Sequence, residues 1–158
     1  MKKVILIISL IFLVGCTSNS MKNNESITEY YLTYNQDKLK VGMNYTNLSL
    51  IVGPYNNVRT EESTYQEGLS NIYEYDDFEV ETYKENNVEK IYAINITNEK
   101  IVTNEGIHLY STKQDMFDCY GNNYYSPYDN VYIYNLNNSN ISFIVENDII
   151  INIRYYLG

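Results

Sequence analysis

The sequence is poor in the residues on which most catalytic and metal sites depend. Its 158 residues include no tryptophan, two cysteines and a single histidine, His108. A Ser-His-Asp arrangement would have to use His108, which lies between Ile107 and Leu109 and is better explained as a structural residue. The sequence also has no Gly-rich phosphate-binding loop and no Cys/His cluster with the spacing of a zinc site. We therefore expect no enzymatic activity and no cofactor.

Basic residues are scarce as well. The chain has 11 lysines and arginines against 20 aspartates and glutamates, which gives a formal net charge of −9. An acidic surface repels nucleic acid and anionic lipid. We therefore expect no nucleic-acid partner and no electrostatic adhesion to membranes.

The N-terminus carries the one long apolar run, and this run is short. Met1-Lys2-Lys3 precedes an uncharged stretch from Val4 to Val14. A transmembrane helix needs roughly 20 apolar residues, so a permanent span is the weaker interpretation. A basic start followed by a short apolar run is typical of a secretory signal, and we predict a signal peptide over residues 1–15.

The end of this run, Leu13-Val14-Gly15-Cys16, resembles a bacterial lipobox. The resemblance implies that Cys16 is diacylated and becomes the first residue of the mature protein. The alternatives are an ordinary secreted protein that is cleaved nearby and a buried thiol at Cys16. Two acyl chains anchor a protein stably, whereas one binds only marginally. We expect a protein held by lipid at the cell membrane, on its extracytoplasmic face. Loss of Lys2 and Lys3 would leave 9 basic against 20 acidic residues, or about −11.

The segment that follows is polar. Thr17 to Thr28 is rich in Asn and Ser and has no periodic apolar residues. Such composition favours a flexible linker, and we predict a lipidated tether over residues 16–36. Cys119 then has no cysteine partner, so we expect no intramolecular disulfide and interpret it as a small buried hydrophobe. A catalytic pair of Cys119 with His108 is the alternative.

Two segments of similar pattern divide the remainder. Val41-Gly42-Met43 leads to Gly53-Pro54, and Leu109-Tyr110-Ser111 leads to Gly121-Asn122 at the same spacing. Each segment predicts a helix of about two turns that ends at glycine.

The two helices have distinct predicted caps and apolar faces. Thr46 is the predicted cap of the first helix, with Leu48 and Ile51 on its apolar face. The predicted cap of the second is Ser111 or Thr112, and its apolar face is formed by Met116, Phe117 and Tyr120.

Strand-like runs follow each helix. They are Ile72 to Tyr75, Phe78 to Tyr83 and Val88 to Ile96, then Val131 to Tyr134, Ile141 to Val145 and Ile149 to Tyr156. The last two strands of each set are joined by Asn86-Asn87 or Asn147-Asp148, which favour tight hairpins with positive φ. The pattern predicts an α+β fold, a tandem repeat of a short helix followed by an antiparallel β-meander, with repeats over residues 37–98 and 99–158. Because three strands alone are marginal, we expect the repeats to share a core or to join edge to edge.

Alternation within the strands predicts which side chains are buried. Phe78, Val80 and Thr82 share one face, and Glu79 and Glu81 share the other. By the same logic aliphatic side chains should point inward and tyrosines outward in two further strands. The inward set is Ile72, Val131 and Ile133, and the outward set is Tyr73, Tyr75, Tyr132 and Tyr134.

The combined pattern resembles the superfamily of β-lactamase-inhibitor-like proteins and small outer-membrane lipoproteins that assist barrel assembly. The residues that carry the resemblance are Val41-Gly42-Met43 to Gly53-Pro54, Gly106-Ile107 to Gly121, and the closing runs Val88 to Ile94 and Ile149 to Tyr155. The resemblance implies a protein-binding fold whose sheet surface or loops contact a partner, and it implies no reaction.

The densest acidic stretch spans residues 74–81. Glu74, Asp76, Asp77, Glu79 and Glu81 are most simply explained as a solvated strand face. Calcium binding and a pair of catalytic carboxylates are the alternatives, although the spacing of an EF-hand is absent.

These patterns lead to one functional expectation. We expect a membrane-anchored, non-enzymatic protein-binding or accessory module with a partner of unknown identity in the cell envelope. Tyrosine is common at interface hot spots, so Tyr73, Tyr75, Tyr132 and Tyr134 are the first candidate surface. The alternative is that these rings cover the sheet or are buried between the two repeats. The loops over residues 56–71 and 122–130 are the second. A small-ligand or metal-binding lipoprotein is the alternative function, and a hydrolase that uses the acidic stretch is the third.

Overall fold

The computed structural model describes residues 28–158, so the predicted signal peptide, Cys16 and residues 16–27 of the predicted tether lie outside the described residues. Within this part the chain forms two helices and nine strands. Their order is β1 (Leu32–Tyr34), β2 (Asp37–Leu39), α1 (Tyr45–Val52), β3 (Asn57–Glu62), β4 (Leu69–Glu74), β5 (Phe78–Glu85), β6 (Val88–Ile96), α2 (Lys113–Tyr120), β7 (Val131–Leu136), β8 (Ser139–Glu146) and β9 (Ile149–Leu157).

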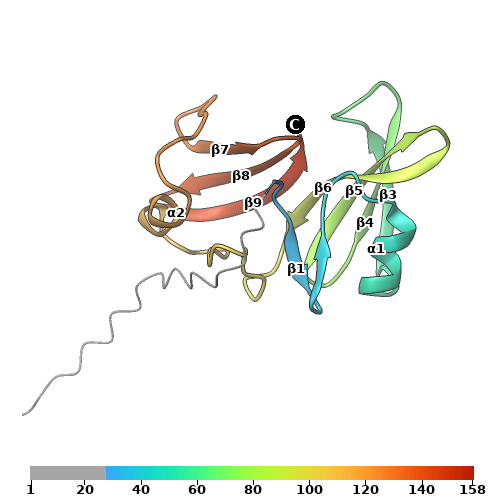
Figure 1. Cartoon of the computed structure of the whole chain (residues 1–158), viewed down its shortest axis with the longest axis horizontal. Helices are drawn as coiled ribbons and strands as arrows, with labels where there is room; N and C mark the ends of the chain where they lie inside the picture. The colour runs from blue at the N-terminus through green and yellow to red at the C-terminus, as the bar shows by residue number, and fades with distance from the viewer. Residues whose placement is uncertain (1–27) are drawn as a thin grey trace, which may run out of the picture.

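Seven strands form one antiparallel sheet in the order β3-β4-β5-β6-β9-β8-β7. Neighbours in sequence pair with each other, except that β6 pairs with β9 in the middle of the sheet. Strands β1 and β2 form a separate hairpin. Figure 1 shows β3 to β6 on one side, β7 to β9 on the other, and the β1–β2 hairpin between the two sides.

The tight turns follow the asparagine chemistry of the sequence. Asn86-Asn87 and Asn147-Asp148 have positive φ at both positions, as predicted. The β1–β2 turn at Asn35-Gln36 has the same conformation. Two positive φ angles match the twist of two-residue hairpins, and asparagine tolerates them better than most residues. The hairpin registers are therefore set locally.

The helices are short and differ in their caps. Helix α2 begins at the predicted Thr112, whose side chain accepts a hydrogen bond from the Asp115 backbone while the Asp115 carboxylate bonds back to Thr112. The predicted cap Thr46 of α1 is wrong, because that helix begins after Asn44, whose side chain makes no capping hydrogen bond. Both helices end at glycine with positive φ, Gly53 and Gly121, as predicted.

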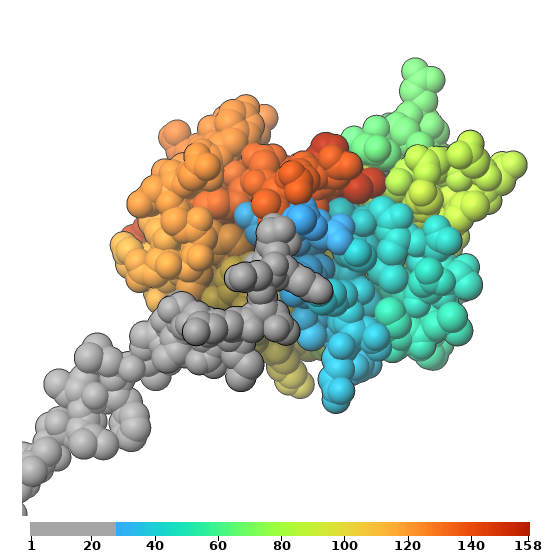
Figure 2. Space-filling model, viewed as in Figure 1, coloured from blue at the N-terminus to red at the C-terminus, as the bar shows by residue number. Residues whose placement is uncertain are grey.

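The larger of two hydrophobic clusters lies between the sheet and the covering elements; the smaller one contains Tyr83, Tyr92 and Ala93. Leu48 of α1, Met116 of α2 and both Leu32 and Leu39 of the β1–β2 hairpin are fully buried in one cluster. The same cluster contains inward side chains from both sides of the sheet, including Val80, Ile94, Phe143 and Ile153. Figure 2 shows the hairpin, in blue, at the surface between the orange segment and the cyan and green segment around α1. The opposite face of the sheet carries neither helix.

The predicted fold class is wrong. The described chain is mostly β, with 47% strand and 12% helix, and it forms one large antiparallel sheet instead of a repeated unit of helix plus β-meander. The first predicted repeat contains four sheet strands and the second contains three, because the segment around β3 also forms a strand. The expectation that the two parts join edge to edge is met by the pairing of β6 with β9.

The predicted tether is too long at its C-terminal end. Residues 32–36 form β1 and its turn, and Leu32 is fully buried. The apolar residues of this segment are few, but Leu32 belongs to the same hydrophobic core as Leu48 of α1 and Met116 of α2. Among residues 28–158, neither helix has the length and apolar character needed to cross a membrane.

Candidate binding groove on the open face of the sheet

The face of the sheet opposite the helices carries polar and charged side chains. On β9, Asn152, Arg154 and Tyr156 point to this face, while Ile153 and Tyr155 are buried in the core. The registers place these residues beside open-face residues of β6 and β8, so one surface continues across the sheet. We call this surface the open face.

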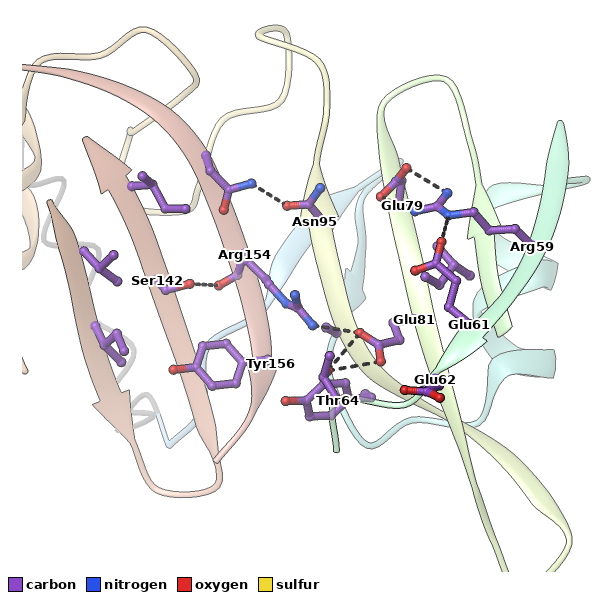
Figure 3. A pocket seen from close by; sticks show the side chains of 17 residues that line it. Arg59, Glu61, Glu62, Thr64, Glu79, Glu81, Asn95, Ser142, Arg154 and Tyr156 are labelled. Carbon is purple, nitrogen blue, oxygen red and sulfur yellow. Dashed lines mark hydrogen bonds and ion pairs between the residues drawn. The ribbon is translucent and has the colours of Figure 1, made fainter. Parts of the chain in front are cut away.

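The open face is hollowed into a groove with a volume of about 600 Å³. Side chains from β3, β4 and β5 form one wall, and side chains from β7 and β8 form the other, with β6 and β9 as the floor between them (Figure 3). The ladder is interrupted by bulges between Glu81 and Thr82 and between Ile144 and Val145. Bulges increase the local twist of a sheet. The added twist helps the outer strands to bend toward the open face on both sides of β6 and β9.

Arg59 organises the β3–β5 wall. Its guanidinium donates to the Glu61 carboxylate at 2.8 Å and to both oxygens of Glu79 at 3.1 and 3.3 Å, and it also bonds to Glu74. Hydrogen bonding to Glu79, then to Glu61 and Glu74, raises the pKa of Arg59 above its ordinary value. Hydrogen bonds from Asn57 and then Arg59 lower the pKa of Glu74 from its ordinary value. One cation thus holds three carboxylates from three strands.

Arg154 joins the two sides of the sheet at the groove floor. It donates from Nη2 to Oε2 of Glu81 at 2.7 Å, although β9 and β5 are separated by β6. Its guanidinium also lies 5.7 Å from the ring centre of Tyr92. Nearby, Asn152 donates to Asn95 at 2.8 Å. These contacts fix the centre of the groove.

The wall formed by β7 and β8 is largely apolar. Val131 and Ile133 of β7 and Ile144 of β8 line the groove and are half-buried. Ser142 adds a polar group between them. The groove therefore has one charged wall and one apolar wall.

The loop between β3 and β4 packs on one end of the groove. The ring of Tyr65 stacks on Tyr92 with centroids 4.6 Å apart and meets Tyr83 edge-on at 5.0 Å. Thr64 donates to Glu81 at 3.3 Å. The predicted loop over residues 56–71 therefore contains strand β3 and the start of β4, joined by residues 63–68, which pack over one end of the open face.

The predicted tyrosine surface is wrong in its orientation. Tyr73, Tyr132 and Tyr134 are only 8, 5 and 3% exposed, because they face the helices, and Tyr75 is half-buried against the same core. Each of the first three donates its hydroxyl to a nearby acceptor: Glu89, the carbonyl of Asp129 and the carbonyl of Gly121, respectively. Their neighbours Ile72, Val131 and Ile133, predicted to point inward, line the groove instead.

The other predicted site residues are placed as follows. In the loop over residues 122–130, Tyr125 and Tyr128 are 62 and 72% exposed, so this second candidate surface is accessible. Cys119 packs against the core, as expected of a small hydrophobe. The ring of His108 contacts the carbonyl of Leu109 at 2.7 Å.

The acidic stretch divides between the groove and a turn. Glu79 and Glu81 face the groove, and their carboxylates bond to the two arginines together with Glu74. Asp76 and Asp77 lie in the β4–β5 turn, where they accept hydrogen bonds from Asn56 and Tyr34. In the described part of the chain no three acidic, histidine or cysteine side chains gather in a way that could hold a metal ion.

The two arginines of the groove were not among the site residues predicted from the sequence. Arg59 and Arg154 are the only arginines in the 158 residues, and both line it. The alternation of Asn152, Arg154 and Tyr156 with buried neighbours was a usable signal. Arg59 gave no such signal, because β3 was assigned to a loop.

Comparison with known proteins does not place the chain in a family. No family model, curated protein or solved structure matches it. The resemblance noted from the sequence therefore stays a sequence-based prediction.

Proposed function

We propose that this protein is a lipid-anchored, non-enzymatic binding module of the cell envelope that holds a partner protein in the groove of its open face. The observation that carries the proposal is the groove itself, a hollow on a sheet face that carries neither helix. Half-buried apolar side chains on one wall and paired charges on the other are the mixture found in protein interfaces. The anchoring follows from the sequence around Cys16.

The contacts within the groove also favour binding. The side chains of the charged wall are already positioned by one another: Arg59 holds Glu74 and Glu79, and Arg154 holds Glu81. A preorganised surface loses less conformational entropy when a partner binds. The tyrosine surface is not part of this proposal, because its rings are buried in the core.

Site-specific photocrosslinking of the full chain in producing cells tests the proposal. A photoreactive residue at Ile133 in the groove should give one discrete adduct, whereas the same residue at Val102, which is 46% exposed outside the sheet, should not. Mass spectrometry would identify the partner, and the purified partner should then bind the purified chain. Equal labelling from both positions, or none from Ile133, would exclude the groove as the binding surface.

A small ligand is the second candidate, favoured by the groove volume. About 600 Å³ lies within the range of roughly 300–1,000 Å³ typical of small-molecule sites. The groove is lined by side chains from all seven strands of the sheet, however, and this extent suits a polypeptide segment better. If the purified chain gives a crosslink from Ile133 in envelope extract and loses it after the extract has been dialysed, the small ligand is favoured.

A further inference from the structure

We infer that the groove recognises a basic, amphipathic segment of its partner, with basic side chains on the β3–β5 wall and apolar side chains on the β7–β8 wall. The inference rests on the proposed function, because it assigns a chemical class to the partner at the same site. It follows from the opposite character of the two walls.

The charge of the groove selects for a cation. Four carboxylates line it, against the two arginines, and these residues are Glu61, Glu62, Glu79, Glu81, Arg59 and Arg154. The arginines are already engaged by carboxylates, so an incoming anion would have to displace them. A carboxylate has more acceptor positions than one hydrogen bond occupies. Incoming lysine or arginine side chains can therefore bond to the glutamates without breaking the existing pairs.

The opposite wall selects for apolar groups. Val131, Ile133 and Ile144 each expose part of an aliphatic side chain to the groove. A bare metal ion or a fully hydrated cation would leave these side chains uncovered. A segment with apolar residues opposite its basic ones would cover them and gain their burial.

The net charge of the chain argues against a second copy of the same chain as the preferred occupant of the groove. Each chain carries a formal net charge of −9, so two copies repel each other, and the acidic groove would meet another acidic surface. The same charge attracts a basic segment and raises its rate of association.

A titration of a labelled peptide tests the inference. The probe is a short peptide with lysines on one side and isoleucines on the other, and its matched control has glutamate in place of every lysine. Fluorescence anisotropy is measured with the full chain in an uncharged detergent, with protein-free micelles as the blank. The lysine peptide should bind, with a dissociation constant that rises with salt, and the glutamate peptide should not.

Three variants locate the binding. Glu61→Gln combined with Glu62→Gln should weaken binding about three- to tenfold and reduce its salt dependence. Ile133→Lys should weaken it at least as much, because it adds a cation to the apolar wall. Val102→Lys is the matched control, since it adds the same charge outside the groove. Circular dichroism of each variant confirms that the fold is retained.

The outcomes separate this inference from the proposed function. Equal binding of the lysine and glutamate peptides, or an unchanged affinity in the Glu61/Glu62 variant, would overturn the inference, while a crosslink from Ile133 would still support the groove as a binding surface. If spermidine alone binds as tightly as the peptide and displaces it, the ligand class is a small organic cation and the inference is wrong. The loss of peptide binding in Ile133→Lys but not in Val102→Lys would support it.

Discussion

At the scale of single residues, tyrosine provides a large part of this core. Tyr73 stacks on Tyr45 of α1 with ring centres 3.9 Å apart, and Tyr134 lies 5.1 Å from Tyr120 of α2. Two-turn helices leave wide gaps above a sheet, and large rings fill them. The hydroxyl groups of Tyr73, Tyr120 and Tyr134 donate to polar acceptors. Within the described residues, the buried hydroxyl of Tyr155 has no hydrogen-bond partner.

Truncation of a tyrosine that is buried between the sheet and the helices should therefore destabilise the folded protein. Tyr134→Ala is expected to lower the free energy of unfolding by about 3–5 kcal/mol, as for other large aromatic residues removed from cores. Tyr128→Ala, at a residue that is 72% exposed, should change it by less than about 0.5 kcal/mol. Urea denaturation followed by circular dichroism measures both, and equal effects would contradict the buried position of Tyr134.

The burial of Tyr73 has a consequence at high pH. Burial, and then the negative charge of Glu89, raise the pKa of Tyr73 to about 12. In the unfolded chain a tyrosine ionises near 10, so the folded state favours the neutral phenol and this contribution to stability is lost as the pH rises from about 10 through 12. Urea midpoints across this range should fall less steeply for Tyr73→Phe than for the unchanged chain.

The alternation of side chains along each strand was predictable, but in β4 and β7 the sequence did not show which set of side chains is buried. The sequence correctly placed Phe78, Val80 and Thr82 on the buried face. In β4 and β7, aliphatic side chains alternate with tyrosines, and either set could form the buried face, because both suit a half-buried strand. Which set faces the helices depends on the space between the helices and the sheet, and the sequence of one strand does not determine that space.

At the scale of elements, the two helices offer a matched test of capping. Thr112 forms a reciprocal capping box with Asp115, whereas the Asn44 side chain makes no capping hydrogen bond. Thr112→Ala should cost about 1 kcal/mol of folding free energy, and Asn44→Ala should cost clearly less. Thermal or urea denaturation of the two variants measures the difference. A larger loss for Asn44→Ala would contradict the assigned caps.

The β1–β2 hairpin is a second test at this scale. Leu32 is fully buried in the core that both helices help to form, so Leu32→Ala should cost about 2–5 kcal/mol of folding free energy. Asp37→Ala, at an exposed position of the same hairpin, is the control and should have little effect. If the segment were a tether, as its composition suggested, neither substitution would change the stability of the protein.

The elements show where local signals suffice. Six sheet strands, both helices and the asparagine turns could be read from the sequence because each has its own periodicity or turn chemistry. Strands β1, β2 and β3 are short, polar or both, and their pairing partners define them. The candidate groove was missed with them, since Arg59 lies on β3.

At the scale of the whole molecule, the pair of Arg154 and Glu81 links the two sides of the sheet. Their side chains are 33 and 11% exposed, in contrast to the pair of Lys90 and Glu85 in one hairpin, at 27 and 51%. A double-mutant cycle with Arg154→Gln and Glu81→Gln should give a coupling energy of about 0.5–1 kcal/mol that falls with added salt. The Lys90 and Glu85 pair should give less. A coupling energy no larger than that of Lys90 and Glu85 would mean that the pair of Arg154 and Glu81 contributes little to the stability of the folded protein.

The groove on the open face could not be predicted from the sequence, for a physical reason. A groove arises from the twist of all seven strands and from the bulges at Glu81/Thr82 and Ile144/Val145. Bulges depend on how two strands align, and the sequence of one strand alone does not set that alignment. The residues that face the groove are predictable from alternation once the phase is known, but the hollow between them is not.

The central pairing of β6 with β9 also sets the order in which the protein can fold. Strand β9 lies far along the chain from β6, with α2, β7 and β8 in between, so β6 remains an open edge until the last hairpin is complete. Because its inward residues Ile91, Ile94 and Ile96 are apolar, the unpaired edge is prone to pair with another chain. At high concentration a β9 strand from a second chain could fill the same place with the same hydrogen bonds, which is the geometry of domain swapping. Refolding from urea should consequently yield exchanged dimers in proportion to the protein concentration.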